Sequence, residues 1–302
     1  MKIVFMGTPD FAVASLDALV RANFNVVAVV TAPDKPAGRG QKLNESAVKK
    51  YAVEKNIPVL QPEKLKNPEF IKVLKSFNAD LQVVVAFRML PEMVWDMPPK
   101  GTINLHGSLL PQYRGAAPIN HAIINGEKES GVTTFFLKHE IDTGDIILSD
   151  KVDIADDETA GDLHDKLMVT GANLLVKTVE AISNGNFTEQ PQSQSDDLKH
   201  APKIFKDDCK INWNNSSKTI YNLIRGLSPY PTAFTLLNNK TLKIFKAEIE
   251  NKEPGIVAGG FLTDGKTYLK FATKDGFIKL LDIQYEGKKR MLIADFLRGI
   301  RL

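Results

Sequence analysis

The chain has 302 residues, of which 43% are hydrophobic and 25% are charged, and its formal net charge is +3. These fractions are typical of a folded globular protein and exclude the intrinsically disordered class. A single cysteine, Cys209, excludes an internal disulfide, indicates a reducing compartment and is expected to be a packing residue. No apolar run reaches the ~18 residues of a membrane span, and the N-terminus begins directly with a strand-like run, so we expect a cytoplasmic protein with no membrane partner.

The first part of the chain predicts alternating strands and helices. Apolar runs predict strands at 2–6, 25–31, 58–60 and 81–86, and helical spacing predicts helices at 11–21, 45–55 and 68–77. This alternation favours a parallel sheet with right-handed crossovers. The turn at Gly7 lacks the glycine spacing of a dinucleotide-binding motif, which argues against NAD.

Residues 33–42 (PDKPAGRGQK) interrupt this pattern with two prolines, two glycines and three basic side chains. Pro- and Gly-rich stretches of this kind predict a loop. Lys35, Arg39 and Lys42 have no apolar neighbours that would fix them. From the residues alone, a solvated and mobile loop is the simplest interpretation.

Residues 102–145 contain the candidate catalytic side chains. If 102–106 is a strand, Asn104 and His106 point to one face, because side chains alternate along a strand. Asp142 follows a second predicted strand, 131–137, in a Gly-flanked loop. An amide donor can stabilise a developing oxyanion, while an imidazole or a carboxylate moves a proton, so the trio suits attack on a carbonyl. Ser108 lacks the Gly-x-Ser-x-Gly surroundings of a nucleophile.

The rest of the chain predicts a second domain. A helix at 159–184 ends at Gly185, and the polar stretch 190–208 is expected to be mostly a surface connection. After a helix at 218–225, short strands are expected at 234–237, 241–249, 255–262, 268–272 and 277–283, followed by a closing helix at 292–298. Short strands with Asn-Asn, Pro-Gly and Asp-Gly joins suggest a small OB-like barrel. The expected division is a domain 1–189, a linker 190–206 and a domain 207–302.

Charge is distributed unevenly between these parts. From Asp207 onward there are 16 Lys and Arg against 10 Asp and Glu, a net charge of +6. A basic region of this kind suits a polyanionic partner, and an ordinary solvated surface is the alternative.

The motifs of the central stretch resemble the active-site set of the 10-formyltetrahydrofolate-dependent formyltransferases. The matching strings are Asn104-x-His106, Ser108-Leu109-Leu110-Pro111-x-x-Arg114-Gly115 and Asp142-Thr143-Gly144-Asp145. The continuation Ala116-Ala117-Pro118-Ile119 is similar to the branch of the family that acts on initiator methionyl-tRNA. The resemblance implies a Rossmann-like formyltransferase domain followed by a smaller barrel. It also implies catalysis by Asn104, His106 and Asp142, with 10-formyltetrahydrofolate as co-substrate and no metal.

The same resemblance implies two sets of binding residues. It places the folate beside a loop after the strand 81–86 and beside the two motifs that follow, at Phe87, Arg88, Met89, Leu90, Ser108, Leu109, Leu110, Pro111, Thr143 and Gly144. It places the tRNA at a basic loop and at a basic cluster before the last helix, at Lys35, Arg39, Lys42, Lys288, Lys289 and Arg290. A loop that becomes ordered on RNA is physically reasonable, because phosphate attraction is strong. The expected enzyme is a monomer.

Two alternatives stay open. The first is a formyltransferase with a small acceptor, such as a nucleotide-sugar amine or glycinamide ribonucleotide, and the basic loop and basic C-terminal part argue against it. The second is a non-catalytic RNA-binding protein, and the complete set of Asn104, His106 and Asp142 argues against that.

Overall fold

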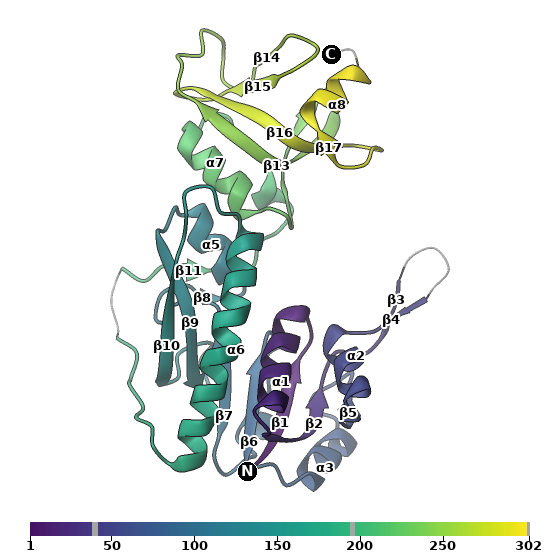
Figure 1. Cartoon of the computed structure of the whole chain (residues 1–302), viewed down its shortest axis with the longest axis vertical. Coiled ribbons are helices and arrows are strands. Elements are labelled where there is room, and N and C mark those ends of the chain that lie inside the picture. The colour runs from purple at the N-terminus through teal and green to yellow at the C-terminus, as the bar shows by residue number, and fades with distance from the viewer. Residues whose placement is uncertain (38–41, 194–196, 301–302) are drawn as a thin grey trace. The chain divides into compact units, whose positions relative to one another are not determined.

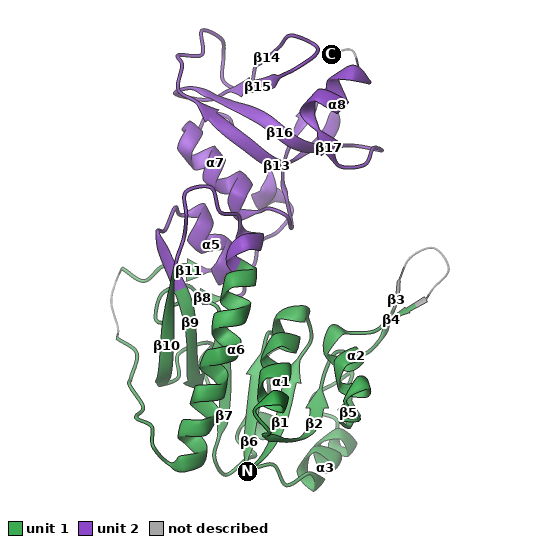
Figure 2. Ribbon diagram, in the orientation of Figure 1, with its two compact units in different colours: residues 1–115, 131–152, 164–200 green, residues 116–130, 153–163, 201–302 purple. Residues whose placement is uncertain are grey.

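The computed structural model describes residues 1–37, 42–193 and 197–300. Chain contacts divide it into two compact units, coloured separately in Figure 2. Unit 1 comprises Met1–Gly115, Gly131–Val152 and His164–His200, and unit 2 comprises Ala116–Ser130, Asp153–Leu163 and Ala201–Leu302. The expected domain boundaries near residues 189 and 207 stay a prediction, because this grouping follows contacts and not chain order.

Unit 1 contains a mostly parallel sheet. Its strands are Lys2–Gly7 (β1), Asn25–Val30 (β2), Val59–Leu60 (β5), Leu81–Val85 (β6), Thr102–His106 (β7), Glu129–Phe136 (β9) and Ile146–Asp153 (β10). Within the described residues their order is β10-β9-β7-β6-β1-β2-β5 (Figure 1). The pairs from β7 through β6, β1 and β2 to β5 are parallel, whereas β9 runs antiparallel to β7. The predicted α/β sheet is therefore confirmed, with an antiparallel addition at the edge that carries the site.

Local chemistry explains where the helices of unit 1 begin and end. They are Asp10–Arg21 (α1), Ala47–Glu54 (α2), Pro68–Ser76 (α3), Glu92–Trp95 (α4) and Ala160–Asn184 (α6), whose first turn belongs to unit 2. The Ser46 hydroxyl accepts from the backbone of Lys49 at the start of α2, and Asn67 caps α3 in the same way. At the end of α6, Gly185 takes the left-handed φ of 67° that a helix-terminating glycine commonly adopts.

The basic segment after β2 is partly a hairpin and not wholly a loop. Lys35–Ala37 (β3) pairs antiparallel with Lys42–Asn44 (β4), and the hairpin extends away from the sheet of unit 1 in Figure 1. Pro36 is compatible with this pairing because a two-stranded ribbon has only edge strands, which tolerate a residue without a backbone N–H. The prediction of a loop over residues 33–42 is therefore wrong for residues 35–37 and for Lys42, which belong to strands.

Unit 2 is built on an antiparallel sheet that curls into a half-barrel (Figure 1). Its strands are Ala233–Leu237 (β12), Lys240–Glu250 (β13), Phe261–Thr263 (β14), Leu269–Ala272 (β15), Phe277–Tyr285 (β16) and Met291–Leu292 (β17). Among the described residues the order is β12-β13-β16-β15-β14, with β17 also pairing with β16. The small barrel predicted for the C-terminal part is confirmed in this form.

Helices complete unit 2, and a buried apolar core joins them to its sheet. They are Pro118–Ile124 (α5), the 3₁₀ turn Asp207–Cys209 (η1), Ser217–Gly226 (α7) and Ile293–Arg298 (α8). The core includes Ile220 and Ile224 of α7 and Phe296 of α8. The sequence predicts a strand at 255–262, but β14 begins only at Phe261. Gly255 and Gly259 have φ values of 63° and 85°, which turn the backbone before that point.

Candidate active site

The strand β7 presents two of the three proposed catalytic side chains. Asn104 lies opposite Val84 of β6 and Phe135 of β9, and His106 lies opposite Thr133 of β9. Because the two residues are separated by one position, they point to the same face of the sheet. His106 is buried and Asn104 is half-buried. The strand predicted for residues 102–106 is confirmed.

The imidazole of His106 is held by a hydrogen bond at one nitrogen and faces a carboxylate with the other. Its Nε2 lies 2.9 Å from the carbonyl oxygen of Tyr113, and because a carbonyl can only accept, Nε2 carries a proton. The other ring nitrogen, Nδ1, faces Oδ2 of Asp142 at 3.9 Å, and the side chains are 9% and 11% exposed. Nδ1 is therefore the ring atom that faces the carboxylate.

The carboxylate of Asp142 belongs to a tight turn between β9 and β10. Asp142 has a φ of 55°, a left-handed value that aspartate tolerates better than most residues. Its Oδ2 accepts a hydrogen bond from the backbone N–H of Gly115 at 3.0 Å. Gly144 has no room for a side chain, since a Cβ there would lie 1.6 Å from the carbonyl oxygen of Phe136. The neighbouring carboxylate of Asp145 pairs with Lys138 at 2.6 Å and so stabilises the turn.

The segment between His106 and Gly115 is fastened to the sheet by hydroxyl groups. Thr133 Oγ1 donates to the carbonyl of Ser108 at 2.7 Å and accepts from the backbone of Leu110 at 3.1 Å. Ser108 is 1% exposed, and its hydroxyl donates to the carbonyl of Gln112 at 2.6 Å. The Ser108 hydroxyl therefore has a structural partner, in agreement with the absence of a nucleophile motif.

The segment also receives contacts from residues far along the chain. The backbone N–H of Tyr113 donates to the carbonyl of Lys199 at 2.6 Å, and the side chain of Gln112 accepts from the N–H of Lys199 at 2.8 Å. Two short strands, Arg114–Gly115 (β8) and His200–Ala201 (β11), mark this part of the backbone. The carbonyl of Tyr113 that orients His106 thus depends on chain beyond α6.

The sequence interpretation missed Gln192, which reaches the site from the polar stretch after α6. Its amide contacts Arg114 as well as the backbone of Asp142 and Gly144, at distances between 2.6 and 3.0 Å. Gln192 stands in a stretch with no hydrophobic periodicity, where nothing local distinguishes it from its polar neighbours. The expected surface connection therefore also contributes a residue to the site.

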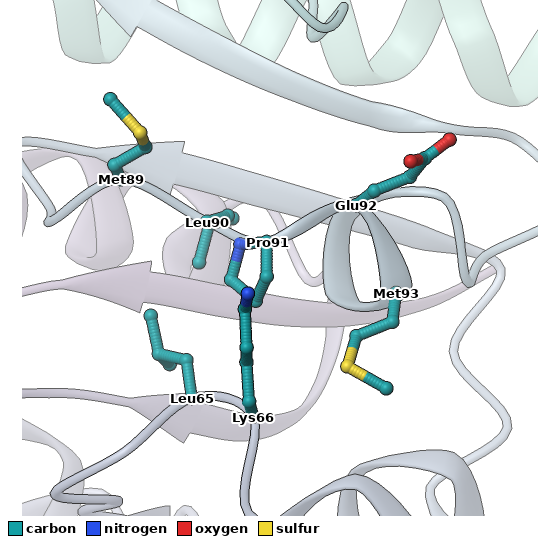
Figure 3. A pocket seen from close by; sticks show the side chains of 7 residues that line it. All are labelled: Leu65, Lys66, Met89, Leu90, Pro91, Glu92 and Met93. Carbon is teal, nitrogen blue, oxygen red and sulfur yellow. The ribbon is translucent and has the colours of Figure 1, made fainter.

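The loop after β6 lines a cavity of about 510 Å³, shown in Figure 3. Lys66 reaches from the loop before α3 toward Leu90 and Pro91 in that view. Leu90 is buried and Met89 is 73% exposed. The full lining is Leu65, Lys66, Met89, Leu90, Pro91, Glu92 and Met93. The lining is mostly apolar and carries one cation, Lys66, and one carboxylate, Glu92, which is the usual composition of a small-molecule site.

Arg88 of the same loop has a structural partner. Its guanidinium donates to the carbonyl oxygens of Pro62 and Glu63, the latter at 2.8 Å, and its Cζ lies 5.6 Å from the centre of the Phe87 ring. Arg88 therefore fastens this loop to the segment after β5. Of the four residues of this loop that are implied for folate contact, Met89 and Leu90 line the cavity.

The residues implied for tRNA contact are in both units. Lys35 is exposed on β3 and Lys42 lies on β4, while Arg39 lies outside the described residues. Lys288 and Lys289 are exposed in the turn between β16 and β17. Arg290 differs from them, because its guanidinium pairs with Asp282 at 2.6 Å and lies 4.1 Å from the centre of the Phe245 ring.

Other reactive side chains have ordinary structural surroundings. Cys209 is 3% exposed, and burial, followed by the nearby Asp208, raises the pKa of its thiol, so it remains a neutral packing residue. His121 contacts the carbonyl of Pro202, and His139 pairs with Glu92 at the surface. Over residues 1–37, 42–193 and 197–300 there is no group of three side chains placed to hold a metal ion. None of the helices described is both long and apolar enough to cross a bilayer.

Comparison with known proteins gives two consistent matches. Residues 1–179 match the family described as formyl transferase, and residues 203–301 match the formyl transferase C-terminal domain. A curated protein of Bacteroides fragilis named methionyl-tRNA formyltransferase is 53% identical over 100% of this chain and 96% of its own length. Proteins of the same name from Phocaeicola vulgatus and Flavobacterium johnsoniae are 56% and 52% identical, and each match covers at least 99% of this chain and 96% of the relative.

Solved structures share the fold at lower sequence identity. WlaRD, a sugar 3N-formyl transferase crystallised with dTDP and 5-N-formyl-THF, has a TM-score of 0.68 and 24% identity over 96% of this chain and 99% of its own. HypX from Aquifex aeolicus, in complex with tetrahydrofolic acid, has a TM-score of 0.68 and 18% identity over 98% of this chain and 47% of its own.

Proposed function

The chain belongs to the formyl transferase family, and we propose that it transfers the formyl group of 10-formyltetrahydrofolate to the amino group of methionine on initiator methionyl-tRNA. This choice of substrates is supported by the curated relatives named methionyl-tRNA formyltransferase, which are 52–56% identical to this chain over nearly its full length. The observation that supports the chemistry is that Nδ1 of His106 lies 3.9 Å from Oδ2 of Asp142, with Asn104 on the same strand as His106. This reaction takes place in translation initiation, and we place the enzyme in the cytoplasm as a monomer.

The three side chains divide the work of acyl transfer. The methionine amine attacks the formyl carbon, and the carbonyl oxygen becomes negatively charged. Asn104 donates to that oxygen, and so does Nδ1 of His106 when it carries a proton, because Nε2 is already bonded to the carbonyl of Tyr113. The proton lost from the amine passes to Asp142. Collapse of the tetrahedral intermediate breaks the bond to N10 of the folate, and Asp142 passes its proton to N10 as the folate leaves, which restores the carboxylate.

The binding residues keep the roles that the family resemblance implied, as proposals. The folate lies against Phe87 to Leu90, Ser108 to Pro111, Thr143 and Gly144. For Arg88 and Ser108, contact through the backbone is favoured, because both side chains already have protein partners. The tRNA lies against Lys35, Arg39, Lys42, Lys288, Lys289 and Arg290, and Arg290 also holds the turn between β16 and β17 through Asp282.

A purified assay with three acceptors tests the function. The protein is incubated with 10-formyltetrahydrofolate and, separately, with aminoacylated initiator tRNA, glycinamide ribonucleotide or a nucleotide-linked amino sugar. Formyl-methionine on the tRNA, with no product from the two small acceptors, is the expected result. Formylation of a small acceptor alone would favour the first alternative. Tight tRNA binding without any formyl product would favour the non-catalytic alternative.

A further inference from the structure

We propose that Gln192 is a positioning residue of this active site, fastening Arg114 to the Asp142–Gly144 turn and thereby holding the Asp142 carboxylate against His106. The inference rests on the proposed function, because it concerns the geometry of the same site. It adds a residue that none of the catalytic motifs contains, placed 50 positions beyond Asp142.

Both the oxygen and the nitrogen of the Gln192 side-chain amide make hydrogen bonds. Its oxygen accepts from Nε of Arg114 at 3.0 Å and from Nη2 at 2.6 Å. Its nitrogen donates to the carbonyl of Asp142 at 2.9 Å and to that of Gly144 at 2.8 Å. Only one orientation of the amide satisfies these partners, because guanidinium nitrogens only donate and carbonyl oxygens only accept. An aliphatic side chain of the same length satisfies none of them.

These contacts close a ring of hydrogen bonds around the catalytic carboxylate. Arg114 is bonded to Gln192, Gln192 is bonded to the backbone of Asp142, and Oδ2 of Asp142 is bonded to the N–H of Gly115, the next residue after Arg114. Asp142 is therefore held at its backbone and at its carboxylate by two segments that are distant in sequence. The same Oδ2 faces Nδ1 of His106.

A backbone pairing brings Gln192 to this place. The N–H of Ile146 at the start of β10 donates to the carbonyl of Gln190 at 2.8 Å, and the N–H of Gln190 donates back at 2.9 Å. Gln190 is itself exposed, whereas Gln192, two positions further on, is half-buried. The segment after α6 is thus anchored beside the Asp142 turn, and the two glutamines give a matched pair in which only one side chain enters the site.

This arrangement predicts a larger effect on turnover than on folate capture. Of the residues proposed to contact the folate, Ser108 and Leu110 are held by Thr133 and Arg88 is held by the carbonyl of Glu63, so they do not depend on Gln192. Gly144 is the exception, because its carbonyl accepts from Gln192 directly. Loss of the amide leaves the Asp142 turn free to move by a fraction of an ångström, and small misplacements of a reacting group can cost about 100-fold in rate.

Three variants test the proposal. Gln192→Met keeps the length of the side chain and removes its hydrogen bonds, Gln192→Glu keeps the acceptors for Arg114 but places oxygen against two carbonyls, and Gln190→Met is the control. The expected result for Gln192→Met is a 10- to 100-fold lower kcat with the KM for folate within about twofold. Gln192→Glu is expected to be at least as impaired, and Gln190→Met to match the wild type. Each kcat is measured with whichever acceptor the wild type formylates.

A second measurement does not depend on turnover. Hydrogen exchange at the Gly115 amide is expected to accelerate in Gln192→Met, because that amide donates to Asp142, while amides of β7 keep their protection. Wild-type kcat and unchanged Gly115 exchange in Gln192→Met would overturn the proposal, as would an equal loss in Gln190→Met. Failure of the wild type to formylate any acceptor would instead overturn the proposed function, and Gly115 exchange would still report whether Gln192 holds the turn.

Discussion

Nδ1 of His106 lies 3.9 Å from Oδ2 of Asp142, and both side chains are about nine-tenths buried. The imidazole is oriented by the carbonyl of Tyr113 and the carboxylate by the N–H of Gly115. Both orienting groups belong to the segment that follows β7, so one stretch of backbone sets the separation of the two reacting groups. The site is therefore built before substrate arrives, which is the condition for electrostatic stabilisation of a transition state.

Asp142→Asn removes the negative charge while leaving an oxygen that can still accept from Gly115. We expect kcat to fall about 100- to 10,000-fold, the range typical of a lost general acid–base group, while the affinity for folate survives. Single-turnover formylation and folate titration measure the two quantities separately. Asp165→Asn is a matched control, because Asp165 pairs with His164 at 2.9 Å on an exposed helix surface. Equal losses of binding and transfer would make Asp142 a structural residue of its turn.

Asn104→Ala removes the amide proposed to donate to the oxyanion. Loss of one such donor typically lowers kcat about 100- to 1000-fold. Because Asn104 is half-buried on β7, water can replace part of its packing, and the unfolding midpoint is expected to change little. Steady-state kinetics and thermal unfolding of the variant measure both. Near-normal turnover would remove Asn104 from the reaction, and His106→Ala, with a similar expected loss, would then test the remaining pair alone.

Lys49→Met tests whether the ends of the β3–β4 hairpin must be held together. Lys49 Nζ contacts Asp34, which precedes β3, and Glu45, which follows β4, the latter at 2.8 Å. With that bridge lost, we expect the KM for initiator tRNA to rise several-fold and the KM for folate to stay unchanged. Lys55→Met is the control, since Lys55 pairs with its exposed neighbour Glu54 and lies against the Tyr51 ring, away from Asp34 and Glu45. A rise in the folate KM alone would contradict the assignment of the hairpin to tRNA.

The pH dependence of that bridge has a defined sign. The pKa of Asp34 is lowered mainly by its hydrogen bond to Lys49 and next by its hydrogen bond to Gln61. The pKa of Lys49 is raised mainly by its hydrogen bond to Asp34 and next by its hydrogen bond to Glu45. The stability that Asp34 contributes to the bridge is present above the ordinary aspartate pKa of about 4 and is lost as the pH falls through the lowered pKa of the folded state. The stability that Lys49 contributes is present below its ordinary pKa of about 10 and is lost as the pH rises through the raised pKa of the folded state. The KM for tRNA should therefore show no change from this bridge between about pH 6 and pH 9.

Arg39→Ala tests the part of the basic segment that lies outside the described residues. If the guanidinium contacts a phosphate, the variant should need more tRNA for half-maximal rate, and its salt dependence should be shallower by roughly one unit of log–log slope. Folate affinity should stay the same. Rates against tRNA concentration at two ionic strengths provide the comparison. Coincident curves for variant and wild type would remove Arg39 from the RNA site and favour a small acceptor.

The sequence by itself determined the elements that follow from local periodicity. The alternation of residues 102–106 places Asn104 and His106 on one face, and the strand β7 has that register. The apolar runs of β1, β2 and β6 predict buried parallel strands, and Gly185 ends α6 where expected. Each of these features depends on residues within one turn or one pleat of each other, so a single stretch of sequence contains the information.

Only the tertiary structure decided the features that join distant segments. Gln192 bonds to Arg114 across 78 positions, and no pattern in its own polar stretch indicates that it enters the site. The pairing of β3 with β4 and the engagement of Arg290 by Asp282 and Phe245 are likewise absent from local propensity. The physical reason is that a hydrogen bond or a ring contact requires two groups to meet in space, while periodicity records only which face of an element is apolar.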